Sequence, residues 1–334
     1  MIKNKKGIQK NKRAKLGLKC LTIALVALLS GTNIYGQDKK IIVAQDGSGD
    51  YKTVQEAINA VPDFRNATTV ILIKNGTYKE KLNLSASKKM VKLIGENPEK
   101  TVLTYDDYAQ KKNSFEEAMG TSGSSSFYIY GDGFAAENIT FANSSGPVGQ
   151  AVAVWIASDQ AVFKNCRFLG FQDTLYTYGR GSRQYYKNCY IEGTTDFIFG
   201  SSTAMFENCI LFCKKGGSYL TAASTPDTTK YGYVFKNCKI TGDAPENSFA
   251  LGRPWRPYAK TVFINCELGN MIKPAGWDHW GKESNKQTAY YAEYKNTGPG
   301  YKPDKRTDWS QQLSDDEAKT YNITQVFRGW NPVQ

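Results

Sequence analysis

Histidine is nearly absent from this sequence, whose 334 residues include only His279. A Ser-His-Asp site would have to use that residue, and no Gly-x-Ser-x-Gly motif accompanies it. The chain also has no Cys/His cluster with zinc spacing and no His-Glu-x-x-His motif. These absences exclude the common serine and zinc hydrolase arrangements and leave carboxylates as the candidate chemical groups. His279 follows a Pro-Ala-Gly turn and is predicted to be a loop residue.

Long apolar runs are also scarce. The longest early one, Leu21–Leu29, is too short for a confident membrane span. Before it lies a basic segment without acidic residues, and after it small and polar residues continue to Gly36. This layout predicts a signal peptide over residues 1–36 and a mature chain that starts near Gln37. We therefore expect a secreted or periplasmic protein with no membrane segment after cleavage.

Most of the apparent excess of positive charge lies in that leader. The chain has 43 Lys+Arg and 31 Asp+Glu, and eight of the basic residues precede Gln37. The mature part therefore has 35 basic against 31 acidic residues, a net charge of about +4. That balance suits a polyanionic substrate and gives no reason to expect nucleic acid.

Few cysteines are present, and their positions recur. Six of the seven remain after Cys20 is removed with the leader, and five of these follow an asparagine. An even count in an exported protein permits disulfides. The recurring place beside aromatic and apolar residues instead favours buried free thiols. A local bridge between Cys209 and Cys213 remains open at this stage.

The same asparagine recurs in a repeated strand-like segment. Successive Asn-Cys cysteines are 23, 20, 29 and 28 residues apart, and no helix accompanies each repeat. A period in the twenties with one strand motif per repeat is typical of a solenoid. We expect an all-β, single-stranded parallel β-helix, with phenylalanine and cysteine inside and asparagine at turns, as one domain over residues 37–334. The aligned segments are AAENITF, AVFKNCRF, QYYKNCYI, AMFENCIL, YVFKNCKI and TVFINCEL.

Two capping boxes predict short helices outside the repeats. Thr53–Val61 has one, apolar residues at helical spacing, and Pro62 as its stop. We expect this helix to cover the first turn of the solenoid, whose edge would otherwise be open. A second box at Ser314–Glu317 begins a helix that we expect to behave likewise at the other end. Residues 106–126 are charged and Gly/Ser-rich, which favours a long loop.

Polar groups that could carry chemistry gather between residues 150 and 200. Gln150, Gln172 and Asp173 precede strand-like runs, and Asp196 stands directly before Phe-Ile-Phe. A charge among apolar residues is costly unless it is paired, so two such carboxylates form a candidate acid/base or acid/nucleophile pair. Each has a structural alternative: Asp173 could cap a turn, Asp196 could form a buried ion pair with Arg253, and the glutamines could belong to an amide ladder.

Several motifs, in this order, resemble the signature set of pectin methylesterases. They are GQAVA (149–153), GFQDTLY (170–176), TTDFIFG (194–200), LGRPW (251–255), PAGW (274–277) and YYAEYKNTGPG (290–300). The resemblance spans essentially the whole mature chain and implies a right-handed parallel β-helix that acts on pectin. The segment TAAST (221–225) differs from the plant version, looks more bacterial and is expected to touch the substrate.

The resemblance also implies roles for individual residues. Asp196 would be the nucleophile that attacks the methyl ester of a galacturonate unit and forms an acyl-enzyme. Asp173 would be the general acid and then the general base. Gln150 and Gln172 would donate to the oxyanion. Arg253 would hold Asp196 ionised and aimed. Trp255, Tyr176 and Thr121 would bind substrate. No metal, no other cofactor and a monomeric state are expected.

Other functions on the same fold remain open. One alternative is a pectate lyase or polygalacturonase. A lyase would need a calcium-binding carboxylate cluster and a basic residue that takes a proton from the sugar. Asp173, Asp196 and Arg253 could imitate that set, but two nearby glutamines suit an oxyanion better. A non-catalytic polysaccharide-binding protein would keep Trp255 and Tyr176 but would not need both carboxylates and both glutamines. The sequence gives little against an esterase of the same family that acts on another acyl group or carbohydrate.

Overall fold

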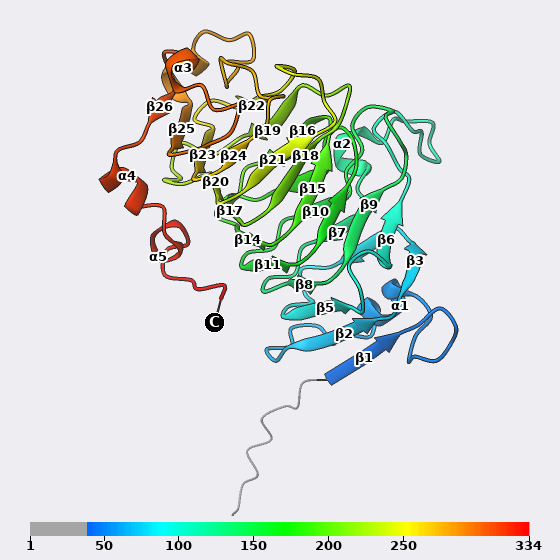
Figure 1. Cartoon of the computed structure of the whole chain (residues 1–334). Helices are drawn as coiled ribbons and strands as arrows, with labels where there is room; N and C mark the ends of the chain where they lie inside the picture. Colours follow the sequence, from blue (N-terminus) through cyan, green and yellow to red (C-terminus); the bar gives the residue numbers. More distant parts are fainter. Residues whose placement is uncertain (1–38, 334) are drawn as a thin grey trace, which may run out of the picture. The chain divides into compact units, whose positions relative to one another are not determined.

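The computed structural model describes residues 39–333, which form a right-handed parallel β-helix. Within these residues the chain coils through three parallel sheets of eleven, seven and eight strands. The coil runs from β1 to β26 in Figure 1. This confirms the predicted solenoid. The predicted signal peptide lies outside the described residues.

Each turn of the coil contributes a strand to each sheet in most of the solenoid, and all paired strands are parallel. The eleven-stranded sheet contains β1 (Lys39–Val43), β2 (Thr69–Ile73), β5 (Val91–Gly95), β8 (Ala135–Glu137), β11 (Ala161–Lys164), β14 (Arg183–Lys187), β17 (Thr203–Glu207), β20 (Tyr233–Lys236), β23 (Lys260–Ile264), β25 (Tyr290–Tyr294) and β26 (Gln311–Gln312). The eight-stranded sheet contains β3 (Gly76–Lys79), β6 (Thr101–Tyr105), β9 (Thr140–Asn143), β12 (Arg167–Leu169), β15 (Tyr190–Gly193), β18 (Ile210–Cys213), β21 (Lys239–Gly242) and β24 (Glu267–Leu268). The seven-stranded sheet contains β4 (Leu82–Leu84), β7 (Phe127–Ile129), β10 (Val154–Ile156), β13 (Leu175–Thr177), β16 (Thr195–Gly200), β19 (Tyr219–Ala223) and β22 (Ala250–Pro254).

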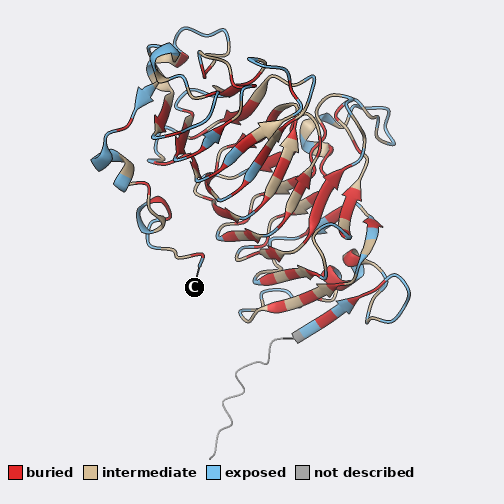
Figure 2. Ribbon diagram, in the orientation of Figure 1, coloured by how far each residue is buried: buried red, intermediate tan, exposed pale blue. Residues whose placement is uncertain are grey.

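Equivalent residues of successive turns stack inside the coil. One ladder of rings runs through five strands of the eleven-stranded sheet, with centroids 4.4–5.0 Å apart and planes within 12° of parallel. Buried residues accordingly line the inner faces of the sheets in Figure 2. Offset stacking of this kind adds to the free energy gained from burying each ring. The ladder consists of Phe163, Tyr186, Phe206, Phe235 and Phe263.

The Asn-Cys repeat forms the corner after five strands of that sheet, β11, β14, β17, β20 and β23. Its asparagines have φ between 51° and 54°, a left-handed conformation that asparagine tolerates better than most residues. The cysteine that follows each asparagine points inward and is buried. All six described cysteines are free thiols, so no bridge joins Cys209 to Cys213. The repeat thus sets the chain's turn with asparagine and fills the core with cysteine.

The first predicted helix is present as α1 (Val54–Asn59), capped by Thr53 and Glu56 in a complete capping box. Val54, Ala57 and Ile58 are buried in the core of the first turn. The loop at residues 106–126 includes the short helix α2 (Gly120–Gly123) and a bridge between Lys112 and Ala118, structure that the sequence did not predict.

The C-terminal helix forms where predicted but lies elsewhere than expected. α4 (Asp315–Lys319) has its capping box, and α5 (Ile323–Val326) follows. Phe327 and Val326 pack with Tyr185 and Val262, which lie on strands of the eleven-stranded sheet. The segment therefore runs back along the outer face of that sheet rather than only covering the last turn. The remaining short elements are α3 (Asn285–Thr288) and the 3-10 helix at Pro303–Lys305, and no described helix has the length and apolarity to cross a membrane.

Candidate active site

A row of aromatic side chains lies on the outer face of the seven-stranded sheet. The parallel register aligns Trp155, Tyr176, Phe199, Ala222 and Arg253 on five consecutive strands. Trp155 and Tyr176 have ring centroids 4.5 Å apart, and Tyr176 stacks on Phe199 at 4.2 Å. Because residues at the same register position point to the same side of a sheet, this row forms an aromatic floor with a guanidinium at one end.

Two carboxyl groups stand beside this floor. Asp173 lies just before β13 and Asp196 lies in β16, and their exposed fractions are only 7% and 5%. The amide of Asp173 donates to the carbonyl oxygen of Thr195 at 3.0 Å, which joins the two segments. Both aspartates have left-handed backbone, with φ of 65° and 50°. Such conformations are uncommon outside glycine and are enriched at functional sites.

A local irregularity directs Asp196. The pairing between β16 and β19 shifts register between Thr195 and Ile198. A bulge of this kind changes the direction of the side chains within it. Asp196 thus faces the pocket although it belongs to an otherwise regular strand.

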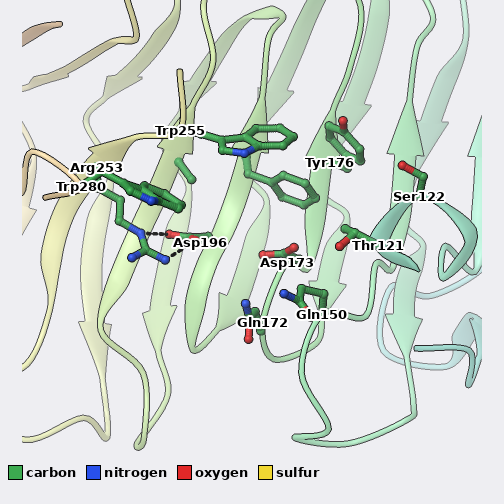
Figure 3. A pocket seen from close by; sticks show the side chains of 12 residues that line it. Thr121, Ser122, Gln150, Gln172, Asp173, Tyr176, Asp196, Arg253, Trp255 and Trp280 are labelled. Carbon is green, nitrogen blue, oxygen red and sulfur yellow. Dashed lines mark hydrogen bonds and ion pairs between the residues drawn. The ribbon is translucent and has the colours of Figure 1, made fainter. Parts of the chain in front are cut away.

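Arg253 holds Asp196 with two hydrogen bonds. Its Nε donates to Oδ1 at 2.9 Å and its Nη2 donates to Oδ2 at 2.6 Å, as Figure 3 shows. The guanidinium also lies between two rings, 3.7 Å from the centroid of Trp280 and 3.9 Å from that of Tyr219. A planar guanidinium suits both a bidentate carboxylate and stacking on aromatic faces. Asp278 accepts a hydrogen bond from the backbone amide of Trp280 at 2.6 Å.

The two carboxyl groups differ in how strongly Arg253 counteracts the rise in pKa that burial causes. Burial raises the pKa of Asp173 well above 3.8, the negative charge of Asp196 raises it further, and Arg253 lowers it. Burial also raises the pKa of Asp196, with a smaller contribution from Asp278, while the hydrogen bonds and charge of Arg253 lower it. Because only Asp196 is bound directly to the guanidinium, it ionises first and Asp173 keeps its proton to higher pH.

Two glutamines line the pocket beside the carboxyl groups. Gln150 and Gln172 form an isolated parallel bridge, and Ala151 donates its amide to the carbonyl oxygen of Gln172 at 3.1 Å. The side-chain oxygen of Gln150 accepts from Gln110 at 3.2 Å, which leaves the Gln150 amide nitrogen as a donor. Both glutamine side chains lie beside Asp173 in Figure 3.

All eight residues selected from the sequence lie in one pocket of about 290 Å³. The sequence analysis missed three of the lining residues, Ser122, Phe199 and Trp280. Phe199 and Trp280 are aromatic residues within or beside recognised motifs, and Ser122 adjoins Thr121. Ala222 belongs to the segment 221–225 that was expected to touch the substrate. The pocket lining predicted from the sequence was Thr121, Gln150, Gln172, Asp173, Tyr176, Asp196, Arg253 and Trp255.

The described residues contain no group of three or more His, Cys, Asp and Glu side chains that could hold a metal ion. His279 lies in a loop, as predicted, and its Nε2 is 3.2 Å from Glu283. The chemistry available inside the pocket is therefore a pair of carboxyl groups with unequal proton affinity, a fixed cation and amide donors.

Comparison with known proteins points to one family. The family model described as Pectinesterase matches residues 40–330. Pectinesterase 31 of Arabidopsis thaliana is 42% identical over 286 residues, which cover 84% of this chain and 89% of that protein. Other curated plant relatives are longer, and the chain spans 41% of the length of one of them, a putative pectinesterase/pectinesterase inhibitor of the same plant.

Solved structures are similar over most of their length. A pectin methylesterase from carrot has a TM-score of 0.80 and 34% identity, covering 86% of this chain and 93% of that one. A pectin methylesterase in complex with a hexasaccharide has a TM-score of 0.78 and 32% identity, covering 87% and 98% of the two chains. Because plant proteins are prominent among these relatives, the expectation of a specifically bacterial type is not supported.

Proposed function

The chain belongs to the pectinesterase family and hydrolyses the methyl esters of pectin, and we propose that it does so through a covalent intermediate on Asp196. The observation that carries this proposal is the unequal pair of carboxyl groups: Asp196 is held in two hydrogen bonds by Arg253, while burial and the neighbouring charge of Asp196 raise the pKa of Asp173 well above its ordinary value. A nucleophile must be ionised and a general acid must be protonated at the same pH.

In the first half of the reaction, an oxygen of ionised Asp196 attacks the carbonyl carbon of the galacturonate methyl ester. The carbonyl oxygen becomes an oxyanion, and collapse of the tetrahedral intermediate breaks the bond to the methoxy group. Asp173 gives its proton to the departing oxygen, so methanol leaves and an anhydride links Asp196 to the sugar.

In the second half, ionised Asp173 takes a proton from water, and the resulting hydroxide attacks the sugar carbonyl of the anhydride. The bond to Asp196 breaks, Asp196 leaves as a carboxylate and the galacturonate carboxyl group is released. Asp173 is again protonated and Asp196 is again ionised, so the site returns to its starting state.

Gln150 and Gln172 would donate amide hydrogen bonds to the oxyanion. The bond from Gln110 to the oxygen of Gln150 supports this role, because it turns the nitrogen of Gln150 toward the pocket side. Removing one oxyanion donor typically lowers kcat by about 10²–10³. Tyr176 and Trp255 would form apolar contacts with the sugar rings, and Thr121, which lines the same pocket, would also contact the substrate.

The setting of the enzyme is part of the same proposal. A signal peptide over residues 1–36 would export the chain to the periplasm or outside the cell, where the mature part from Gln37 would act as a monomer. Catalysis would need no metal and no other cofactor, because carboxylates perform both the nucleophilic and the proton-transfer steps.

The test is methanol release from highly methylated pectin in the presence of a chelator, with wild type and Asp196→Ala compared. Methanol from wild type alone is the expected result. An unsaturated product that absorbs ultraviolet light, and whose formation the chelator stops, would instead identify a lyase. Methanol from folded Asp196→Ala at the wild-type rate would remove Asp196 from the mechanism.

A further inference from the structure

The segment 106–126 leaves the coil between β6 and β7 and contributes two residues to the lining of the catalytic pocket. It folds back on itself in two places. The amide of Met119 donates to the carbonyl oxygen of Lys111 at 3.0 Å, and the amide of Gly120 donates to that of Ala109 at 2.9 Å. The segment therefore has a defined conformation where it meets the pocket.

A buried carboxylate fixes the first residues of this segment. The side chain of Asp107 is only 3% exposed, and the ammonium groups of Lys81 and Lys111 lie 2.5 and 2.7 Å from its oxygens. Asn143 of β9 donates its side-chain amide to the carbonyl oxygen of Asp107 at 2.8 Å. A buried charge that is paired and hydrogen-bonded is costly to separate from its partners. The residues that follow Asp107 are thus held at a fixed place beside the coil.

Two hydrogen bonds connect this fixed part of the segment to Gln150. The amide of Ala109 donates to the carbonyl oxygen of Gln150 at 2.9 Å. The side-chain nitrogen of Gln110 donates to the side-chain oxygen of Gln150 at 3.2 Å. The first contact holds the backbone of Gln150, and the second occupies its amide oxygen. An amide whose oxygen is occupied in this way has its two N–H groups left for another acceptor.

The glycine at position 149 makes room for the contact between the two glutamines. Gly149 has a φ of +103°, a conformation that other residues rarely adopt. A Cβ at this position would lie 3.1 Å from the side-chain oxygen of Gln110 and 3.4 Å from its nitrogen. A larger residue would therefore strain the backbone and push the amide of Gln110 away from Gln150.

We propose that Gln110 is a positioning residue, which holds the amide of Gln150 with its N–H groups toward the oxyanion of the reaction. This inference rests on the proposed function, in which Gln150 is an oxyanion donor. A donor that is aimed before the reaction stabilises the developing charge without having to turn at that moment. Gln110 is not among the described residues that line the pocket, so it acts through Gln150 and not on the substrate.

The first test removes the hydrogen bond. Gln110→Met should lower kcat for methanol release by about three- to tenfold, because one neutral hydrogen bond has a modest net free energy. KM should stay within about twofold, since the substrate does not touch Gln110. In a Gln150→Met background the same change should have no further effect on kcat, because its only route to the reaction is already removed. Circular dichroism verifies that each variant is folded.

The second test reverses the hydrogen bond. An ionised glutamate only accepts, so Gln110→Glu should turn the nitrogen of Gln150 away from the pocket and its oxygen toward the oxyanion. A protonated glutamate still donates, and an ordinary glutamate has a pKa of about 4.3. The ratio of wild-type to Gln110→Glu kcat should therefore be within about threefold near pH 4 and rise to about a hundredfold at pH 7. Ser114→Asp, which adds the same charge at an exposed residue of this segment, should give a ratio independent of pH.

The outcomes separate the inference from the proposed function. Wild type that releases no methanol, or full activity in Gln150→Met, contradicts the proposed function or its oxyanion donor. An unchanged kcat in Gln110→Met overturns the inference alone. An equal loss with and without Gln150 also overturns it, as does a Gln110→Glu ratio that follows that of Ser114→Asp. A loss in kcat that disappears in the Gln150→Met background, together with a Gln110→Glu ratio that rises with pH, supports it.

Discussion

Two arginine–carboxylate pairs in this protein have the same chemistry and different surroundings. Arg253 and Asp196 have side chains that are 19% and 7% exposed, and they lie in the catalytic pocket. Arg306 and Glu293 have side chains that are 3% and 0% exposed and lie beneath a surface loop. The difference shows how one ionic contact can serve reactivity in one place and folding in another.

The guanidinium of Arg306 is surrounded by acceptors. It donates to both oxygens of Glu293, at 2.6 and 3.2 Å, and also to the carbonyl oxygens of Lys273, Pro274 and Gly300. Asn296 donates to Glu293 at 3.1 Å. Buried charges are tolerated when their remaining hydrogen-bonding capacity is satisfied. We call Arg306 and Glu293 the closed pair, because hydrogen-bond partners surround both side chains. Its hydrogen bonds connect residues 273–274 and 300 to β25.

The guanidinium of Arg253 has different contacts. Within residues 39–333 its hydrogen bonds go only to Asp196, and the rings of Tyr219 and Trp280 cover its two faces. Rings fix the plane of a guanidinium without using its N–H donors. The carboxylate of Asp196 is thus aimed by the pair while one of its sides stays open to the pocket. The closed pair is built for stability, and the open pair is built to react.

The largest effect is expected from Asp196→Asn. The side chain keeps its shape but loses its nucleophilic charge, so methanol release should fall on the order of 10⁴-fold or more. Glu293→Gln, the matched change in the closed pair, should keep kcat within about threefold at temperatures where the protein is folded. Initial rates on methylated pectin, with circular dichroism to verify folding, measure both. More than a hundredth of wild-type activity in Asp196→Asn would contradict the assigned role.

Stability should respond in the opposite order. Glu293→Gln leaves a buried guanidinium without its counter-charge, which costs about 3–5 kcal/mol in the free energy of unfolding. Denaturant unfolding followed by fluorescence measures this loss. Asp106→Asn is the control, because its partners Lys79 and Lys111 are 58% and 38% exposed and such pairs each contribute up to about 1 kcal/mol. Equal losses in Glu293→Gln and Asp106→Asn would show that burial of the closed pair has no energetic consequence.

Asp173→Asn should damage the reaction and stabilise the fold at the same time. In the proposed mechanism this variant lacks the general acid, so methanol release should fall by about 10²–10⁴-fold. The pKa of Asp173 is raised in the folded protein, so the folded state binds a proton that the unfolded state has already lost, and wild-type stability falls as pH rises above 3.8. Asparagine cannot ionise and removes this loss.

Unfolding free energies of wild type and Asp173→Asn should therefore be similar at acid pH and should diverge as pH rises, with the variant the more stable. A constant difference at every pH would mean that Asp173 has an ordinary pKa in the folded state. In the proposed mechanism the alkaline limb of the wild-type activity profile should report the same proton, because activity should decline as Asp173 ionises.

The smallest effect is expected from the rings around Arg253. Tyr219→Leu removes one face of the sandwich, which should lower kcat by about five- to tenfold. Because Arg253 would then lower the pKa of Asp196 less effectively, the acid limb of the activity profile should move to higher pH. Tyr219→Phe keeps the ring and should restore most of both properties. A Tyr219→Leu variant with an unchanged pH profile would assign the ring to packing alone.

Much of the fold could be predicted from the Asn-Cys repeat and the capping boxes alone. The alignment on Asn138, Asn165 and the four later asparagines predicted the solenoid, the turns and the buried cysteines. The helix after Thr53 followed from its capping box. The capping box at Ser314 predicted a helix but not its place, because packing of Phe327 against the eleven-stranded sheet depends on side chains far away in sequence.

Within the active site, the same division holds. The order of the motifs and their resemblance to pectin methylesterases were enough to select Asp173, Asp196, Gln172 and Arg253, although each residue taken alone has a structural alternative. Trp280 was missed because its role depends on lying against Arg253, across a loop that no local pattern describes. Likewise Tyr219 belongs to an ordinary strand and matters only for the face it presents.

Local sequence therefore decides the period of the coil, its inward and outward faces and the chemical groups available, because strand alternation and turn conformation are local properties. The tertiary structure decides which of those groups meet. Arg253 reaches Asp196 across 57 residues only because the β19–β22 register aligns it with Ala222, and Asp196 faces the pocket only because the β16–β19 pairing shifts. Register is a property of paired strands, and a single strand does not contain it.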